Sequence, residues 1–326
     1  MNGRPYALLL AAALFAAPAL AADAASQAGQ VRPRPAALAP EARMAMILGL
    51  ARAADRVVAV GEQGVVLLRD APGAAPRQAR SVPVDATLTA VSFAGARQGW
   101  AVGHWGVILA TADGGEHWQQ QRLDIASDRP LFAVHFFDAE HGVAVGLWSL
   151  VLTTADGGKT WAERRLQPPA GGGKADLNLL GLFADARGTL YATAERGMVL
   201  ASTDRGATWR YLPTGYTGSF WSGIALADGS LLVGGQRGSL YRSEDGGQRW
   251  TALDSGAKHS ITAFARRGTE VVAVGLEGFV AVSRDGGRSF AAQTRADRLA
   301  LTAALDDGTG RWLFGSRSGL VPEPPR

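Results

Sequence analysis

The sequence contains no cysteine, which excludes disulfides, thiol catalysis and thiolate metal sites. It also excludes a bacterial lipoprotein, because the lipid is attached to a cysteine. Histidine is scarce, and its five positions (104, 117, 135, 141 and 259) lack the spacing of metal ligands. We therefore expect neither a metal nor another cofactor.

Charge of one sign is not concentrated anywhere in the chain. The formal net charge is +4 over 326 residues, with acidic and basic residues interspersed. This pattern lacks the Lys/Arg stripe of a nucleic-acid binder and only mildly favours acidic partners. No apolar run beyond the N-terminus is long enough to cross a membrane.

The N-terminus has the organisation of a secretory signal peptide. Arg4 gives a positive start, residues 7–17 form a short apolar run, and Ala-Leu-Ala follows at 19–21. We expect residues 1–22 to be cleaved, leaving 23–326 as a periplasmic or secreted protein that does not itself span the membrane. The alternative is an uncleaved anchor.

Three short motifs recur along the rest of the chain with a period of about 40–48 residues. The first is an apolar segment whose third residue is small. Its seven copies begin at Ile47, Leu88, Leu131, Leu179, Phe220, Ile261 and Leu301. The second follows each copy and is a turn of the form G-x-x-G between two apolar runs, such as GEQG at 61–64, which is typical of a β-hairpin.

The third motif resembles T-x-D-G-G-x-x-W, as in TADGGEHW at 111–118. Its aspartates are Asp113, Asp156, Asp204, Asp245 and Asp285. Asp70 belongs to a decayed sixth copy.

A repeat of this length with four short strands is one blade of a β-propeller. We predict an all-β protein in which 23–326 form a single seven-bladed β-propeller, with blades starting at the seven residues above. The small third residue fits an innermost strand crowded near the axis. The alternative is a stacked β-solenoid of similar repeats.

The seventh repeat stops after its third strand. We expect residues 28–43 to supply the missing outer strand, so that an N-terminal strand closes the last blade. Without that strand the blade exposes an unpaired edge.

The third motif is an Asp-box, or BNR repeat. With the segment W-A-V-G-x-x-G-x-I-L-x-T-x-D-G-G from Trp100 to Gly115, it resembles the photosystem II stability/assembly factor family. The resemblance covers Ile47 to the end of the chain. The resemblance implies that this chain is a seven-bladed Asp-box propeller and a relative of that family from a non-photosynthetic bacterium.

The five Asp-box aspartates look catalytic, but we assign them a structural role. An aspartate before Gly-Gly accepts hydrogen bonds from N–H groups of its own turn. Five equivalent copies cannot all surround one active site.

The strand directions sort the loops onto two faces. The Asp-box turns share one face, and the G-x-x-G turns share the other with the long, varied loops that join consecutive blades. On this second face we predict a partner-binding site, whose candidate residues are His104, Trp105, Trp148, Arg196, Arg237 and Arg317. The alternatives are that the tryptophans fold onto neighbouring loops and that the arginines pair with Glu195, Glu277 and loop acids.

We expect an exported, non-enzymatic protein-binding or assembly factor. It is a monomer whose partner is a membrane protein or its periplasmic part, and it is accessory to a membrane protein complex or transporter. One alternative is a sialidase-like glycosidase, which needs three arginines, a tyrosine nucleophile and a carboxylic acid. The mature tyrosines are 191, 211, 216 and 241, and we place 191 and 241 in the core. A carbohydrate-binding module using Trp105 and Trp148 is the other alternative.

Overall fold

The apolar segment that opens each repeat forms the innermost strand of an antiparallel sheet. A computed structural model describes residues 32–169, 172, 174–256 and 258–323. The inner strands are β1 (Ile47–Ala53), β5 (Leu88–Ala94), β9 (Leu131–Phe136), β13 (Leu179–Ala184), β17 (Phe220–Ala225), β21 (Ile261–Arg267) and β25 (Leu301–Asp306).

Three further strands follow in most repeats. The second strands are β2 (Arg56–Gly61), β6 (Gln98–Gly103), β10 (Gly142–Gly146), β14 (Leu190–Ala194), β18 (Leu231–Gly235), β22 (Glu270–Gly275) and β26 (Trp312–Ser316). The third strands are β3 (Val66–Arg69), β7 (Ile108–Thr111), β11 (Val151–Thr154), β15 (Met198–Ser202), β19 (Leu240–Ser243), β23 (Phe279–Ser283) and β27 (Gly319–Pro322). The outer strands are β4 (Arg77–Gln78), β8 (Gln119–Arg122), β12 (Ala162–Glu163), β16 (Arg210–Pro213), β20 (Thr251–Ala252) and β24 (Ala291–Thr294).

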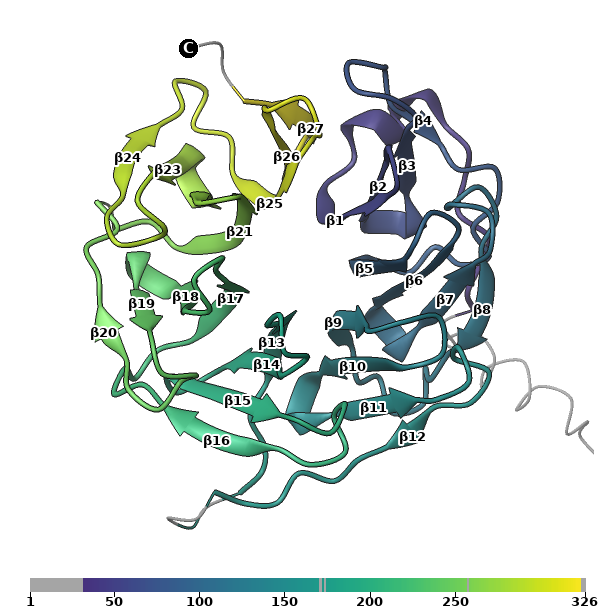
Figure 1. Cartoon of the computed structure of the whole chain (residues 1–326). Helices are drawn as coiled ribbons and strands as arrows, with labels where there is room; N and C mark the ends of the chain where they lie inside the picture. Colours follow the sequence, from purple (N-terminus) through teal and green to yellow (C-terminus); the bar gives the residue numbers. More distant parts are fainter. Residues whose placement is uncertain (1–31, 170–171, 173, 257, 324–326) are drawn as a thin grey trace, which may run out of the picture. The chain divides into compact units, whose positions relative to one another are not determined.

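Within the unit Pro33–Arg326, the described strands form seven sheets whose inner strands surround a common axis (Figure 1). The predicted all-β, seven-bladed propeller is confirmed, and we number its blades 1 to 7 in chain order. The second strands are almost wholly buried because each sheet is covered by a neighbouring blade on both faces. Burial on both faces explains why these segments are continuous apolar runs.

The small third residue of each inner strand is required by the neighbouring blade. A Cβ added to Gly49 would lie 3.0 Å from the Cα of Ala90, and one added to Gly181 would lie 3.0 Å from the carbonyl of Trp221. Adjacent inner strands therefore approach one another at the backbone, where only small side chains fit.

Each inner strand carries a β-bulge at its second residue. In blade 1, Ile47 of β1 pairs with Gly61 of β2, and Gly49 pairs with Val60. Leu48 is therefore left without a partner on β2. The same register shift occurs in the other six blades. The bulge residues are Leu48, Thr89, Phe132, Leu180, Trp221, Thr262 and Thr302.

The prediction that an N-terminal strand closes the last blade is wrong for the described part of that segment. Among the described residues, the sheet of blade 7 consists of β25, β26 and β27, and residues 32–46 form no strand. They run along blade 1, where the N–H of Ala36 donates to Val82 (3.0 Å), and then form the 3₁₀ turn η1 (Pro40–Met44). Backbone groups bonded to blade 1 are not available to β27. Residues 28–31 of the predicted latch lie outside the described residues.

The N-terminal segment instead takes the place of a loop between blades. A Cβ on Gly319 of blade 7 would lie 2.1 Å from the carbonyl of Arg43, just as one on Gly64 of blade 1 would lie 2.0 Å from that of Val84. The ring closes through direct contact of blades 7 and 1. Thr302 Oγ1 donates to the Ile47 carbonyl, and Arg69 pairs with Asp307 at 3.4 Å.

Residues 1–22, the predicted signal peptide, lie outside the described residues. In the described part of the chain, no helix has the length and apolar character needed to cross a membrane.

Candidate functional site

The G-x-x-G motifs form tight turns with an unusual backbone. In blade 1 the N–H of Val65 donates to the carbonyl of Glu62 (3.0 Å), and both central residues, Gln63 and Gly64, have positive φ. This is a type I′ turn, whose first central position favours Asn, Asp or Gly. Six blades place another residue type there: Gln63, Trp105, Trp148, Arg196, Arg237 and Glu277, with φ of 52–57°.

Left-handed backbone at a non-glycine residue costs about 1–2 kcal/mol. Six large side chains are held there, although the turn itself favours smaller residues. Such positions occur where surrounding structure holds them, often at sites of function. We call the face that carries these turns and the loops between blades the GxxG face.

The loops between blades fix the turns. The N–H of Gly197 donates to the carbonyl of Gly218 (2.6 Å), and the hydroxyl of Thr214 donates to the carbonyl of Gly197 (2.8 Å). Ser255 donates to Gly238 in the same way in the next blade. The side chains on the GxxG face are thus presented by a rigid framework rather than by free loops.

The two tryptophans predicted for the site differ. Trp105, in η3 (His104–Gly106), is half-buried and packs against the core between blades 1 and 2. Trp148, in η4 (Leu147–Ser149), is 61% exposed. Only Trp148 presents a large free aromatic surface, which is a feature of partner-binding patches.

The three arginines also differ. Arg196 pairs with Asp176 at 3.3 Å rather than with Glu195, whose carboxylate accepts hydrogen bonds from Asn178. Arg237, in η5 (Gln236–Gly238), and Arg317 are exposed, and their guanidinium groups have no acidic partner among the described residues. His104 is exposed beside Trp105.

The GxxG face carries unpaired positive charge. The loops and turns place further cations there without an acidic partner among the described residues: Arg165, Lys174 and Lys258. Several acids of this face are engaged, since Glu62 accepts the N–H of Met46 and Asp254 accepts that of Gly256. An anionic partner therefore meets free cations there.

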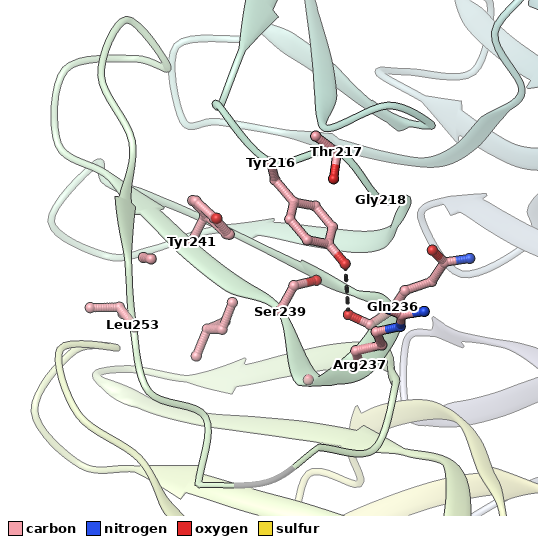
Figure 2. Close-up of a pocket in the computed structure, with 11 residues that line it drawn as sticks. Tyr216, Thr217, Gly218, Gln236, Arg237, Ser239, Tyr241 and Leu253 are labelled. Atoms are coloured by element: carbon pink, nitrogen blue, oxygen red, sulfur yellow. Dashed lines mark hydrogen bonds between the residues drawn. The ribbon is translucent and has the colours of Figure 1, made fainter.

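A pocket of about 510 Å³ opens at blade 5 on this face (Figure 2). Its lining residues are Tyr216, Thr217, Gly218, Gln236, Arg237, Gly238, Ser239, Leu240, Tyr241, Ala252 and Leu253. The hydroxyl of Tyr216 donates to the carbonyl of Gln236 at 3.2 Å, and the buried Oγ of Ser239 has no hydrogen-bond partner in the described structure.

This pocket suits a carboxylate side chain better than a catalytic centre. Arg237 is its only arginine, and no Asp or Glu lines it. It therefore lacks the three-arginine clamp and the carboxylic acid that a sialidase needs. Tyr191 is buried as predicted, and Tyr241 packs against the core of the same region while also lining the pocket.

A second hollow, of about 520 Å³, lies beside Trp148. It is bordered by Arg165 and Lys174, and the N–H of Trp148 donates to Asn178 (3.0 Å). An aromatic surface next to two cations suits an acidic segment that also carries apolar side chains.

The Asp-box aspartates lie on the opposite face, which we call the Asp-box face. The Thr160 hydroxyl and N–H both donate to Asp156 and hold its pKa at about 2. In blade 2, Trp118 donates its ring N–H to Gly115 and is buried in the core beside blade 1. The Asp-box thus ties its turn to the core between blades.

We predict that Asp204→Ala lowers the free energy of unfolding by about 1 kcal/mol. The carboxylate accepts hydrogen bonds from the Thr208 N–H (2.9 Å), the Thr208 hydroxyl (2.6 Å) and Ser202 (2.8 Å), and all three are lost. Urea unfolding measures the loss, with Thr203→Ala as the control because Thr203 is exposed on the same turn. Partner binding lost without any loss of stability would give the Asp-box face a functional role instead.

No cluster of three or more His, Asp or Glu suited to a metal occurs among the described residues. Tyr216, Ser239 and Leu253 line the pocket, and their positions in the sequence did not predict it. The pocket combines a loop between blades, a turn and an outer strand, and these lie up to 37 positions apart in the chain, from 216 to 253.

Comparison with known proteins gives two kinds of match. The family described as "Photosynthesis system II assembly factor YCF48" matches residues 71–133 and 121–269, which is more than half of the chain. The solved structure "YCF48 bound to D1 peptide" is 18% identical with a TM-score of 0.71, and the match covers 91% of this chain and 98% of that chain. "YCF48 from Cyanidioschyzon merolae" is 17% identical with a TM-score of 0.68, over 89% and 97%. At these identities the two structures show a shared fold. No curated protein matches.

Proposed function

Because this chain belongs to the YCF48 photosystem II assembly factor family, we propose that it is an exported assembly factor that binds a segment of a protein partner on its GxxG face. The partner is a membrane protein, or the part of one outside the cytoplasm, in a complex or transporter that this protein helps to assemble. The protein performs no catalysis in this role. The signal peptide predicted at residues 1–22 supports export to the periplasm or beyond.

One observation carries the proposal: the GxxG face holds exposed, unpaired arginines and an exposed tryptophan on strained but rigid turns. Arg237 and Trp148 both have positive φ; over the part of the chain that the structure describes, the Arg237 guanidinium has no acidic partner, and the Trp148 side chain is exposed. Arginine and tryptophan are the residue types that most often dominate the energy of protein interfaces. The structure of a family member bound to a D1 peptide adds a precedent for a peptide partner.

The test uses the mature protein as bait in a detergent extract of its own membranes. A Trp148→Ala, Arg237→Ala double variant should recover its partner less well than wild type, by about tenfold or more in affinity. Recovery should also fall as salt rises to about 0.5 M, because exposed charges are screened.

Lys159→Ala is the matched control, since Lys159 is an exposed cation on the Asp-box face. Equal recovery by the double variant and wild type would move the site away from the GxxG face. Turnover of a fluorogenic sialoside that is abolished by mutating Tyr216 or Arg237 would contradict the non-enzymatic role.

A further inference from the structure

The bulge residues of the inner strands form a ring around the axis, and this ring is not uniform. Thr89, Thr262 and Thr302 occupy it in blades 2, 6 and 7. Blades 1, 3, 4 and 5 carry Leu48, Phe132, Leu180 and Trp221 instead. The inner strands β9, β13 and β17 of blades 3 to 5 are neighbours around the axis (Figure 1), so the large apolar residues of the ring come from three consecutive blades.

The threonines show where a bulge side chain reaches. Thr89 Oγ1 donates to the carbonyl of Leu131 (2.7 Å), the first residue of the next inner strand, and Thr262 donates to that of Leu301 (2.7 Å). The bulge position therefore lies between adjacent inner strands, at the end of the strand next to the GxxG turns. A bulge directs its side chain away from the regular pattern of the sheet.

The apolar members of the ring are not part of the hydrophobic core. Phe132, Leu180 and Trp221 are only partly buried, and over the described residues they neither belong to any core cluster nor pack against one. Among the described residues, no acceptor is hydrogen-bonded to the indole N–H of Trp221. Apolar surface that stays in contact with water is unfavourable, so these three side chains favour burial by a partner.

We propose, building on the function proposed above, that Phe132, Leu180 and Trp221 form the anchor site for one bulky apolar side chain of an acidic, extended segment of the partner protein. The positive charges of the GxxG face favour an acidic segment as the occupant of this site. Arg237 lies on the turn of blade 5, the blade that carries Trp221, and Arg165 and Lys174 lie in the loop between blades 3 and 4. The segment's carboxylates meet these cations while its apolar side chain covers the ring residues.

The chain itself provides substitutions that the bulge accepts. Because threonine occupies this position in three blades, Phe132→Thr and Trp221→Thr place a residue that the same backbone already holds. Leu48→Thr in blade 1 is the matched control, since it makes the same kind of change at the same position outside blades 3 to 5. Thermal unfolding of all three variants checks that the propeller is intact.

The probes are two short synthetic peptides of Asp, Glu, Gly and Ser that differ at one central residue, Phe or Ala. Wild type should bind the Phe peptide at least about tenfold more tightly than the Ala peptide, measured by calorimetry. The Phe132→Thr, Trp221→Thr double variant should lose this preference, and Leu48→Thr should keep it. Binding of the Phe peptide should also shift the emission of Trp221.

Equal affinity of wild type for the two peptides would overturn the anchor site while leaving the acidic segment and the GxxG face in place. Loss of the preference in Leu48→Thr as well would overturn the assignment to blades 3 to 5. Failure of both peptides to bind would count against the anchor site and the proposed function together, whereas a loss of Ala-peptide binding in Arg237→Ala would support the proposed function alone.

Discussion

Gly197→Ala should be among the most damaging single substitutions in the protein, with a loss of about 3–5 kcal/mol in the free energy of unfolding. Gly197 has φ of +63°, and a Cβ there would lie 1.8 Å from the carbonyl oxygen of Tyr216. That oxygen belongs to backbone in the loop between blades 4 and 5. The clash has no flexible side chain to relieve it, so the turn or the loop must move.

Gly73→Ala is the control that separates strain from clash. Its φ is +78°, but an added Cβ would meet nothing within 4 Å. This variant should therefore lose only about 1 kcal/mol, the cost of the left-handed backbone. Urea unfolding of both variants measures the difference, and equal losses would mean that the loop yields to the methyl group.

Ser149 shows how the fold accepts a side chain at the position equivalent to Gly197. Its φ is +57°, and its hydroxyl donates to the carbonyl of Leu177 at 3.2 Å. The loop that follows blade 3 is the longest between blades, and it leaves room where the loop after blade 4 does not. Only the three-dimensional course of each loop decides which turn needs glycine.

The number of blades was predictable because three separate motifs mark the repeats in the sequence. An apolar strand with a small third residue, a tight turn and an Asp-box recur together, and the inner strands begin at the residues where the repeat begins. Repeats of this kind bury their faces only against one another, so period and count determine the architecture.

The closure of the ring was not predictable in the same way. A spare N-terminal segment and a missing outer strand suggest that the two pair, but they do not show which other groups compete for the segment. Gln78 of blade 1 donates its amide to the carbonyl of Ala37 (2.7 Å) and accepts the N–H of Ala39 (3.1 Å). These hydrogen bonds join residues about 40 positions apart in sequence, and no local sequence pattern predicts them.

The candidate site was predictable by face but not by residue. Trp105 and Trp148 occupy the same place in the repeat, yet one packs on the core and the other is exposed. The bulges were also hidden, because a register shift depends on how two strands pair. Their residues were nevertheless visible as the second position of the first motif, which is threonine in three copies and a large apolar residue in the other four.

The decayed Asp-box of blade 1 has been replaced by an ion network with blade 2. Arg77 pairs with Asp70 (2.7 Å) and with Glu116 (2.9 Å), and Arg56 pairs with the same two carboxylates at 2.7 and 3.1 Å. Glu116 belongs to the Asp-box turn of blade 2, so the network joins two blades. Hydrogen bonds from Arg77 lower the pKa of both Asp70 and Glu116.

We expect Arg77→Met to lower the free energy of unfolding by about 2 kcal/mol at pH 7, since it leaves Asp70 and Glu116 to share Arg56, with the exposed Arg80 as a further cation 3.6 Å from Glu116. A carboxylate whose pKa is lowered by folding stabilises the fold above its unfolded pKa of about 4, and this contribution is lost as pH falls. The difference in unfolding free energy between wild type and Arg77→Met should therefore shrink from about pH 6 to about pH 3, as both carboxylates become protonated. Urea unfolding across this range measures it.

Arg196→Met is the matched control, because Arg196 pairs with Asp176 at 3.3 Å and the side chains of the two residues are 65% and 41% exposed. An exposed pair contributes about 0–1 kcal/mol, so this variant should unfold nearly like wild type at every pH. A loss of stability in Arg77→Met that stays constant down to about pH 3 would show that the arginine stabilises the blade contact by packing rather than by its charge. A loss of stability that vanishes when the carboxylates are protonated would show that the ion network replaces the missing Asp-box. At other blade contacts, the Asp-box carboxylate stabilises its own turn by hydrogen bonds.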